Sequence, residues 1–317
     1  MPTYLVTGGA GFIGSNVIGE LARRGEAVRA LDNLATGHIE NLASLRKKIE
    51  WHEADIRNLE NIRPDFEGVD YVIHLAAIPS VPRSVEDPLT SNAVNVDGTL
   101  NVLLAARDAG AKRVVFSASS AAYGDHPALP RVESQKPRPL SPYALTKLAG
   151  EYYCKIFTQV YGLETVSLRY FNIFGPRQSP DSAYSGVLSL FISAYVNGNI
   201  PTILGDGEQS RDFTYVANAV DATLRACTAP QASGQVINVG TGDRHTLNET
   251  IEILNRIFGR QLTPRYGAVR AGDVQHSHAD ITLARKLLGY EPGVRFEEGL
   301  RKTVDWFRSS RSSSNRS

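Results

Sequence analysis

The chain has 317 residues, of which 42% are hydrophobic and 21% charged, and its formal net charge is +1. This composition is typical of a soluble globular protein, and the charge gives no indication of a nucleic-acid or membrane partner. No apolar run approaches the ~20 residues of a membrane span, and no signal peptide precedes the first predicted strand. The two cysteines lack metal-ligand spacing, so we expect free thiols, no metal site and a cytoplasmic protein.

The first half of the chain alternates apolar runs with helical stretches. Such alternation predicts an α/β, Rossmann-like doubly wound fold, with a parallel sheet buried between helices. The predicted strands are Tyr4–Thr7, Ala27–Leu31, Ile49–His52, Tyr71–Leu75, Arg113–Ser117 and Thr165–Arg169. The predicted helices between them include Phe12–Arg24, Ser91–Ala109 and Pro142–Tyr161, the last with Ser141 as its N-cap.

After Arg169 the pattern loosens. The expected elements are helices over Gly186–Asn197, Thr246–Phe258, Leu283–Leu288 and Phe296–Phe307, and a strand over Gln235–Asn238. Thr246 and Glu249 have the spacing of a capping box. We expect residues 1–172 to form a dinucleotide-binding domain, to which the chain returns around 214–240. Residues 173–213 and 241–310 would form a smaller α/β substrate-binding lobe, and 311–317 a disordered tail.

Three glycines, Gly8, Gly11 and Gly14, lie between the first predicted strand and the first predicted helix. This spacing lets the backbone approach a pyrophosphate at the helix N-terminus, although tight turns also use glycine for steric reasons. Asp32 ends the second strand, where a carboxylate accepts hydrogen bonds from a ribose and repels a 2′-phosphate; a structural aspartate in a turn is the alternative. The pattern predicts a NAD site. Further expected contacts are Phe12, Ile13, Asn33, Asp55, Ile56, Leu75, Ala76 and Ala77.

Tyr143 and Lys147 lie four residues apart on a predicted helix and therefore share one face. A free phenol has a pKa near ~10, and an adjacent ammonium favours the phenolate that acts as a base. Ser117–Ser120 ends the fifth strand, where open α/β sheets bind ligands, so a hydroxyl there can share a proton with Tyr143. The alternatives are a serine that caps the strand and an exposed tyrosine beside a solvated lysine. Together with the glycine turn, the set predicts hydride chemistry on an alcohol carbon.

These motifs resemble the extended short-chain dehydrogenase/reductase family, and more closely its nucleotide-sugar 4-epimerases. The likeness covers nearly the whole chain and includes Thr7–Gly14, Asp32-Asn33, His74–Ala77, Ser117–Gly124, Tyr143–Lys147, Leu168–Asn172, Gly205–Gly207, Arg211–Phe213 and Arg270–Asp273. It implies that Ser119, Tyr143 and Lys147 are catalytic and that NAD is the cofactor. It implies further cofactor contacts at Asn95, Ser117 and Tyr170. It implies contacts to a UDP-sugar at Ser119, Tyr143, Asn172, Val187, Arg211, Arg270, Asp273 and Ser277.

The resemblance also implies a mechanism and an assembly. Tyr143 would take the proton of the sugar 4-hydroxyl while C4 gives hydride to NAD, and hydride would return to the other face of the 4-keto sugar. Arg211 and Arg270 would bind the diphosphate, for which a guanidinium fork is well shaped. A homodimer through a helix bundle is implied, with Ser91–Ala109 and Pro142–Tyr161 as candidate helices. Their apolar residues fit a monomer core equally well.

Differences from related families reduce the number of reactions that the chain is expected to catalyse. The 4,6-dehydratases place Asp-Glu after the catalytic hydroxyl, and decarboxylases that form UDP-xylose place Glu at the second position, whereas this chain has Ser120-Ala121. UDP-glucuronate 4-epimerases follow their equivalent of Gly175–Gln178 with an arginine, where this chain has Ser179. We therefore expect a neutral hexose. A UDP-glucuronate 4-epimerase and an oxidoreductase that releases NADH stay as alternatives, as does a non-enzymatic NAD-dependent sensor.

Ser277 bears on the 2-substituent of the sugar. In similar epimerases the residue four beyond the Asp of the Arg-x-Gly-Asp motif borders this substituent; tyrosine restricts the enzyme to glucose and galactose, and a small residue accepts N-acetyl sugars. Ser277 occupies this position. The expected reaction is therefore NAD-dependent 4-epimerisation of UDP-Glc and UDP-Gal, and of UDP-GlcNAc and UDP-GalNAc.

Overall fold

The computed structural model describes residues 1–179, 186–269 and 274–314. Its sheet consists of β1 (Thr3–Thr7), β2 (Ala27–Asp32), β3 (Glu50–Glu53), β4 (Tyr71–His74), β5 (Arg113–Ser119), β6 (Glu164–Tyr170) and β11 (Gln235–Val239). These seven strands are parallel and lie in the order β11-β6-β5-β4-β1-β2-β3. The order reverses between β1 and β4, the position where doubly wound sheets bind ligands at their carboxyl ends. The predicted fold class is confirmed.

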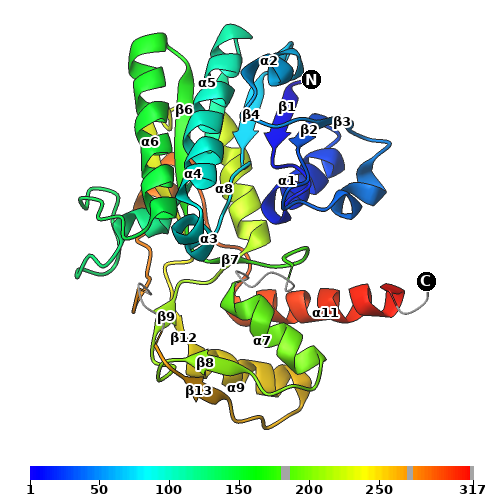
Figure 1. Cartoon of the computed structure of the whole chain (residues 1–317), viewed down its shortest axis with the longest axis vertical. Helices are drawn as coiled ribbons and strands as arrows, with labels where there is room; N and C mark the ends of the chain where they lie inside the picture. The colour runs from blue at the N-terminus through cyan, green and yellow to red at the C-terminus, as the bar shows by residue number, and fades with distance from the viewer. Residues whose placement is uncertain (180–185, 270–273, 315–317) are drawn as a thin grey trace.

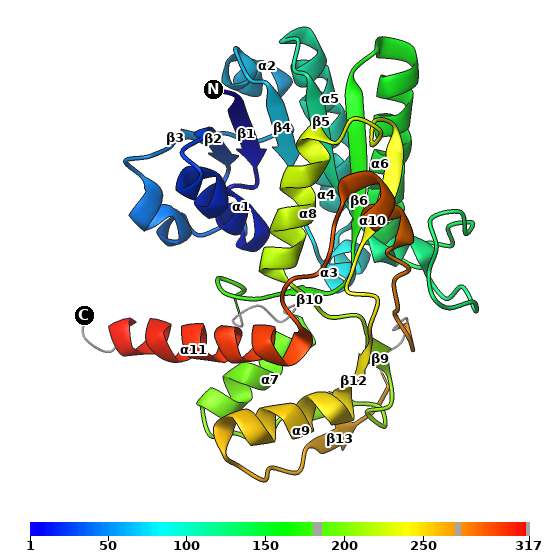
Figure 2. The ribbon, with the colours of Figure 1, turned by 180° about the vertical axis from the view of Figure 1, so that it is seen from behind.

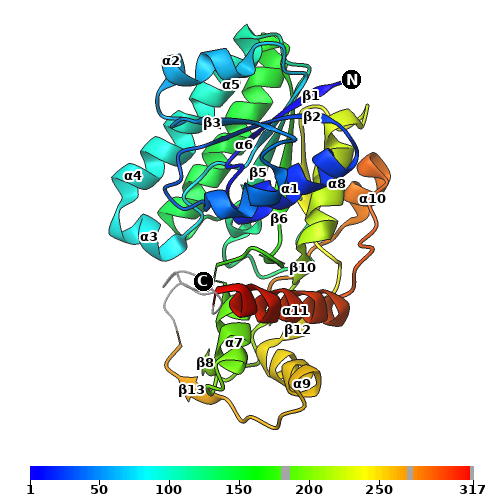
Figure 3. The same ribbon diagram turned by 90° about the vertical axis from the view of Figure 1, so that its right-hand side faces the viewer.

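Helices cover both faces of the sheet, and successive side chains of a strand point to opposite faces. On β4, Val72 belongs to a core shared with α5 (Gly98–Asp108) and α6 (Pro142–Tyr161). Its neighbour Ile73 belongs to a second core shared with α1 (Phe12–Arg23) and α8 (Val216–Thr228). Figure 3 shows the two helix layers on either side of the sheet, and Figure 2 shows α8 in front of it. The uninterrupted apolar strands of the sequence thus reflect burial on both faces.

The segment expected as one helix over Ser91–Ala109 contains three successive elements. Short helix α4 (Pro88–Asn92) is followed by the π-helical turn η3 (Ala93–Asp97) and then by α5. The other short elements around the sheet are η1 (Ile39–Leu45), α2 (Leu59–Ile62), η2 (Arg63–Phe66), α3 (Val81–Glu86), η4 (Ser120–Tyr123) and α10 (Thr282–Leu288).

The remaining elements form the lower part of Figure 1 and its junction with the sheet. They are β7 (Ile173–Phe174), α7 (Val187–Val196), β8 (Thr202–Leu204), β9 (Ser210–Arg211), β10 (Thr214–Tyr215), β12 (His245–Thr246), α9 (Leu247–Phe258), β13 (Arg265–Gly267) and α11 (Phe296–Ser314). The capping box of Thr246 and Glu249 is present at the start of α9. Helix α11 extends to Ser314, into the segment expected to lack structure. Over the described ranges, no helix combines the length and apolar character that crossing a bilayer requires.

Helix α6 packs unusually closely on β5. A Cβ added to Gly150 would lie 2.8 Å from Cε1 of Phe116, a ring that is buried beneath the helix. Real Cβ atoms do not approach other atoms so closely, so a glycine is needed at this crossing. Tyr143 and Lys147, which are predicted to be catalytic, lie on the same helix.

We predict that Gly150→Ala destabilises the protein, although alanine favours an isolated helix over glycine by ~1 kcal/mol. The added methyl group overpacks the contact with Phe116 and should lower the free energy of unfolding by about 1–3 kcal/mol. Gly19→Ala in α1 is the matched control, because a Cβ there would meet only ordinary contacts at 3.7 Å and beyond. Denaturant unfolding should show opposite signs for the two variants; equal signs would contradict the packing argument.

Candidate active site

A cavity of about 820 Å³ lies at the carboxyl ends of the central strands. Most of the residues predicted for the cofactor line it: Gly8, Gly11, Phe12, Ile13, Gly14, Asp32, Asn33, Ile56, Leu75, Ala76, Ala77, Ser117, Tyr143, Lys147 and Tyr170. The predicted substrate residues Ser119, Asn172, Arg211 and Ser277 line it as well. One cavity therefore contains residues from both predicted sites.

The glycine turn brings three backbone segments together. Gly8 has φ 71°, and a Cβ on it would lie 2.7 Å from the backbone nitrogen of Ala76. A Cβ on Gly14 would collide with the carbonyl oxygen of Gly8. Helix α1 begins after Gly11 without a side-chain cap, so no side chain of the N-cap accepts its first N–H groups. Such a helix start is suited to a pyrophosphate, and these residues therefore fit NAD.

Asp32 is buried at the cavity wall and organises the turns around it. Its carboxylate accepts hydrogen bonds from Ala10 N at 3.0 Å and Leu34 N at 2.8 Å. Burial raises its pKa, and the backbone hydrogen bonds oppose that increase. The structural role considered for this aspartate is thus present, together with its position beside the cavity.

Asp55 is not among the residues that line the cavity. Its carboxylate accepts hydrogen bonds from Arg57 and, at 2.9 Å, from Nδ2 of Asn33. The Arg57 guanidinium lowers the pKa of Asp55 to about 2. Arg57 itself lines the cavity. The sequence places Arg57 directly after Ile56, which was the available signal for this residue.

Asn95, another expected cofactor contact, lies behind the wall and is only 1% exposed. Its Oδ1 accepts from Ile78 N at 2.8 Å, and its Nδ2 donates to the oxygen of Ile78 at 3.2 Å and to Oγ1 of Thr146 at 3.1 Å. All three bonds are to protein groups. In this structure Asn95 joins the cavity wall at Ile78 to the helix that carries Tyr143.

Lys147 is buried, and its Nζ donates a hydrogen bond to the carbonyl of Ser117 at 2.8 Å. Burial lowers the pKa of Lys147 to about 8. Burial raises the pKa of Tyr143, while a hydrogen bond with Ser119 lowers it in part. Burial is thus the largest influence on this phenol, and its direction is opposite to the one expected from the neighbouring ammonium. Ser119 also accepts from Ala121 N at 3.2 Å, as a strand-end cap would.

Tyr170 contributes to the cavity wall, but its hydroxyl points elsewhere. It forms a 2.7 Å hydrogen bond with Oγ1 of Thr223 on α8. Because this hydroxyl is already paired within the protein, any contact with a ligand involves the rest of the residue.

Two of the predicted substrate residues, Asn172 and Ser277, are hydrogen-bonded to each other. Asn172 has φ 40°, and its Nδ2 donates to the oxygen of Asp212 at 3.1 Å and to Oγ of Ser277 at 3.3 Å. Arg211 donates to the carbonyl of Gln275 at 3.0 Å. Val187 begins α7 and is not among the cavity-lining residues. Arg270 and Asp273 lie outside the described residues.

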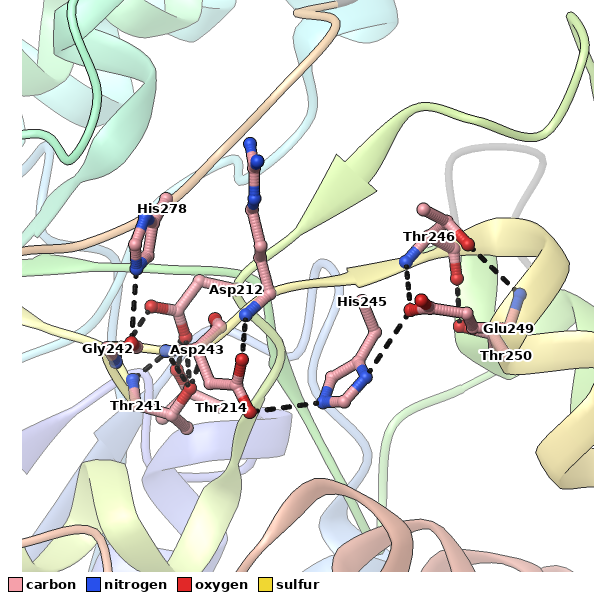
Figure 4. A network of polar contacts seen from close by, with 11 residues as sticks. Asp212, Thr214, Thr241, Gly242, Asp243, His245, Thr246, Glu249, Thr250 and His278 are labelled. Atoms are coloured by element: carbon pink, nitrogen blue, oxygen red, sulfur yellow. Dashed lines mark hydrogen bonds and ion pairs between the residues drawn. The ribbon is translucent and has the colours of Figure 1, made fainter.

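Asp212 fixes the two segments that carry Arg211 and Ser277. This fully buried carboxylate accepts from Thr241 N at 2.8 Å, Thr241 Oγ1 at 2.7 Å and Ala279 N at 3.2 Å. Figure 4 shows its carboxylate within the polar network that extends from His278 to Thr250. Arg211 precedes it by one residue, and Ala279 follows Ser277 by two. The carboxylate therefore holds both segments in place beside the cavity.

Several polar side chains of the cavity wall were not predicted from the sequence. They are Arg57, Arg83, Arg131, Gln178 and His276. Gln178 and His276 are the immediate neighbours of Ser179 and Ser277, so the interpretation came within one residue of both. Ser120, Ala121 and Ser179 also line the cavity, so the positions used to distinguish related families do face it.

His74 on β4 links the end of β1, which precedes the glycine turn, to helix α5. Its buried ring is paired with Oγ1 of Thr7 at 2.7 Å and Oγ1 of Thr99 at 3.0 Å. Thr7 Oγ1 also accepts from Ala76 N at 3.3 Å. Burial lowers the pKa of His74 to about 3, so the ring is neutral at physiological pH.

Comparison with protein families shows which family the chain belongs to. The model of the NAD dependent epimerase/dehydratase family matches residues 4–240. The chain belongs to this family. Membership agrees with the predicted NAD site, because the glycine turn and the Tyr143–Lys147 helix both lie within the matched residues.

Individual family members resemble the chain over nearly its whole length. A UDP-glucose 4-epimerase of Mycolicibacterium smegmatis is 40% identical and covers 96% of this chain and 98% of its own. The solved UDP-N-acetylglucosamine 4-epimerase of Methanobrevibacter ruminantium, in complex with UDP-N-acetylmuramic acid, is 41% identical, with a TM-score of 0.93 and coverage of 98% and 99%. The UDP-glucose 4-epimerase of Thermus thermophilus in complex with NAD is 38% identical, with a TM-score of 0.88 and coverage of 97% and 99%.

We predict that His74 makes the folded protein sensitive to acid. The folded state disfavours the charged ring, so stability is complete above the unfolded pKa of 6.5 and is lost as the pH falls toward about 3. Between pH ~7 and ~5 this group alone should remove about 2 kcal/mol from the free energy of unfolding. Denaturant unfolding of His74→Gln should show a correspondingly smaller loss. His38→Gln, at an exposed histidine, is the control; identical losses in both variants would contradict the prediction.

Proposed function

We propose that the protein is an NAD-dependent 4-epimerase of UDP-hexoses. Its reaction would interconvert UDP-Glc and UDP-Gal, and also UDP-GlcNAc and UDP-GalNAc, through a transient 4-keto sugar. The carrying observation is that Ser119, Tyr143 and Lys147 line the same cavity as the glycine turn. Ser120 and Ala121, beside the catalytic hydroxyl, have no acid for dehydration or decarboxylation.

The proposed roles follow from the geometry. Ser119 and Tyr143 both line the cavity, and Ser119 lowers the pKa of Tyr143, so the two oxygens can act on one substrate hydroxyl. Tyr143 takes the proton of the 4-hydroxyl and returns it after the 4-keto sugar has turned over. Lys147, held by the carbonyl of Ser117, binds the nicotinamide ribose. NAD, held at the glycine turn and by Lys147, would supply the acceptor and donor for the hydride of C4, and its positive charge would lower the pKa of the nearby phenol.

The proposed substrate range rests on Ser277 and Ser179. Both small side chains line the cavity. Ser277 leaves room for an N-acetyl group, and Ser179 does not supply the cation that a sugar carboxylate would need. An oxidoreductase that releases NADH is the alternative, and an accumulation of free NADH would favour it.

We also propose a cytoplasmic homodimer. Leu145, Tyr152, Ile156 and Val160 are exposed on α6. Their spacing of seven, four and four residues places them along one face of the helix, as expected for a helix that packs on a partner. Of the apolar residues on α5, Leu103 is buried in the core of the monomer. Cys154 and Cys227 are free and buried, which agrees with a reducing compartment.

We predict that the wild-type protein epimerises UDP-galactose and UDP-GlcNAc without added NAD, because the cofactor is regenerated in each cycle. Tyr143→Phe should lower kcat by about 10²–10⁴-fold, the usual contribution of a general base, and should still bind NAD. The measurement is product analysis by chromatography, with bound NAD quantified after denaturation. If the wild type forms no 4-epimer even with NAD supplied, the proposed function is wrong. Near-normal turnover by Tyr143→Phe would remove this residue from the role of base.

We predict that Ser277→Tyr selectively impairs the N-acetyl substrates. The phenol occupies the space beside the 2-substituent, so kcat/KM for UDP-GlcNAc should fall at least about tenfold more than that for UDP-glucose. Ser277→Ala is the control, since it removes the hydroxyl without adding volume. Equal losses on both sugars would contradict the assignment of this position.

A further inference from the structure

The backbone N–H of Tyr143 is satisfied by a residue of another helix. Helix α6 starts at Pro142, which has no N–H, and Ser141 caps it by accepting from Ala144 N at 3.2 Å. The N–H of Tyr143 lies between these two and belongs to the first turn, where no carbonyl of the helix can accept it. It donates instead to Oγ of Ser84 at 3.0 Å. Ser84 is therefore a second cap of α6, supplied by α3.

The hydroxyl of Ser84 is oriented to accept the hydrogen bond from Tyr143 N. It is 0% exposed, and its hydroxyl proton goes to the carbonyl of Val81 at 2.7 Å, which leaves a lone pair for Tyr143 N. Helix α3 starts at Ser80, which lines the cavity and caps the helix by accepting from Arg83 N. Ser84 directly follows Arg83, which also lines the cavity. The hydrogen bond between Tyr143 N and Ser84 Oγ thus joins the cavity wall that comes after β4 in the chain to the first turn of α6.

The carbonyl of Tyr143 is held as well. Thr146 Oγ1 donates to it at 2.8 Å and accepts from Nδ2 of Asn95 at 3.1 Å. Asn95 in turn bonds both backbone groups of Ile78, which lines the cavity. Both polar backbone groups of Tyr143 are therefore linked through hydroxyls to the segment 78–84.

We propose that Ser84 is a positioning residue for Tyr143. Ser84 fixes the phenol of Tyr143 relative to Ser119 and to the part of the cavity wall that faces the cofactor. The inference rests on the proposed function, in which the phenol must meet the sugar 4-hydroxyl while C4 faces the nicotinamide. A displacement of ~1 Å in such a geometry can cost up to ~10²-fold in rate. Without its acceptor, the N–H of Tyr143 would have to turn toward water, and the first turn of α6 would move with it.

Ser84→Ala should therefore lower kcat about tenfold and leave KM within about twofold, because the substrate contacts stay in place. The variant should also show a shifted pH profile. The hydrogen bond with Ser119 lowers the pKa of Tyr143, and a displaced phenol loses part of it. Tyr143 acts in its deprotonated form, so the rising limb of kcat should move to higher pH.

The other charged and titratable side chains of the cavity are identical in the two proteins, so their effects cancel in the comparison. They are Asp32, Arg57, Arg83, Arg131, Lys147, Tyr170, Arg211 and His276. Ser91→Ala is the matched control. Ser91 is equally buried on α4, and its hydroxyl has no hydrogen-bond partner among the described residues, so its removal should change neither kcat nor the pH profile. Ser84→Cys, which keeps a weaker acceptor of similar size, should give an intermediate result.

The experiment measures pH profiles of kcat and KM for wild type and the three variants with UDP-galactose. In parallel, the ultraviolet absorbance of ionised tyrosine is titrated in each NAD-bound protein and in its Tyr143→Phe counterpart, and the difference reports Tyr143 without turnover. A titration shifted to higher pH in Ser84→Ala supports the inference. An unshifted titration overturns it, as does a loss of kcat by the same factor at every pH. Absence of turnover in the wild type contradicts the proposed function instead, and the absorbance titration still decides the role of Ser84.

Discussion

The close packing of helix α6 on strand β5 is the constraint on which the site depends. Gly150 lets the helix approach the ring of Phe116, and this approach brings Nζ of Lys147 to within 2.8 Å of the carbonyl of Ser117. The ammonium is buried as a result, and its pKa falls to about 8. Such a burial opposes stability at neutral pH, because the charged form is disfavoured in the folded state. Tyr143 lies one turn before Lys147 on the same rigid helix, so its position follows from this packing.

The opposite wall of the cavity is rigid for a different reason. Ser277 N donates to the carbonyl of Ser210 at 2.9 Å, and Arg131 N donates to the carbonyl of His278 at 2.7 Å. The neighbouring Ala279 is bound to the buried carboxylate of Asp212. Because backbone bonds hold this segment on both sides, a larger side chain at position 277 cannot be accommodated by a retreat of the chain. This rigidity supports the proposed role of residue 277 in the choice of sugar.

The sequence predicted the elements whose pattern is strong and local. The helix over Pro142–Tyr161 was predicted to the residue, because Ser141 and Pro142 mark its start. Helix α8 was missed because its buried positions include the polar residues Asn218 and Thr223 among the apolar ones. Position at a strand end predicted Asp55 as a cofactor contact, but it does not line the cavity, and its pairing with Arg57 depends on side-chain directions that spacing does not encode. The direction of the pKa shift of Tyr143 likewise depends on burial, which a four-residue spacing cannot reveal.

In the proposed reaction, hydride leaves C4 of the sugar and returns to the same carbon within one site. A reaction with UDP-galactose that carries deuterium at C4 tests it most directly, with the product analysed by mass spectrometry and NMR. We expect that UDP-glucose forms with deuterium still at C4, because the hydride taken from C4 is the one returned to it. Loss of the label to solvent, or its appearance in released NADH, would contradict the account.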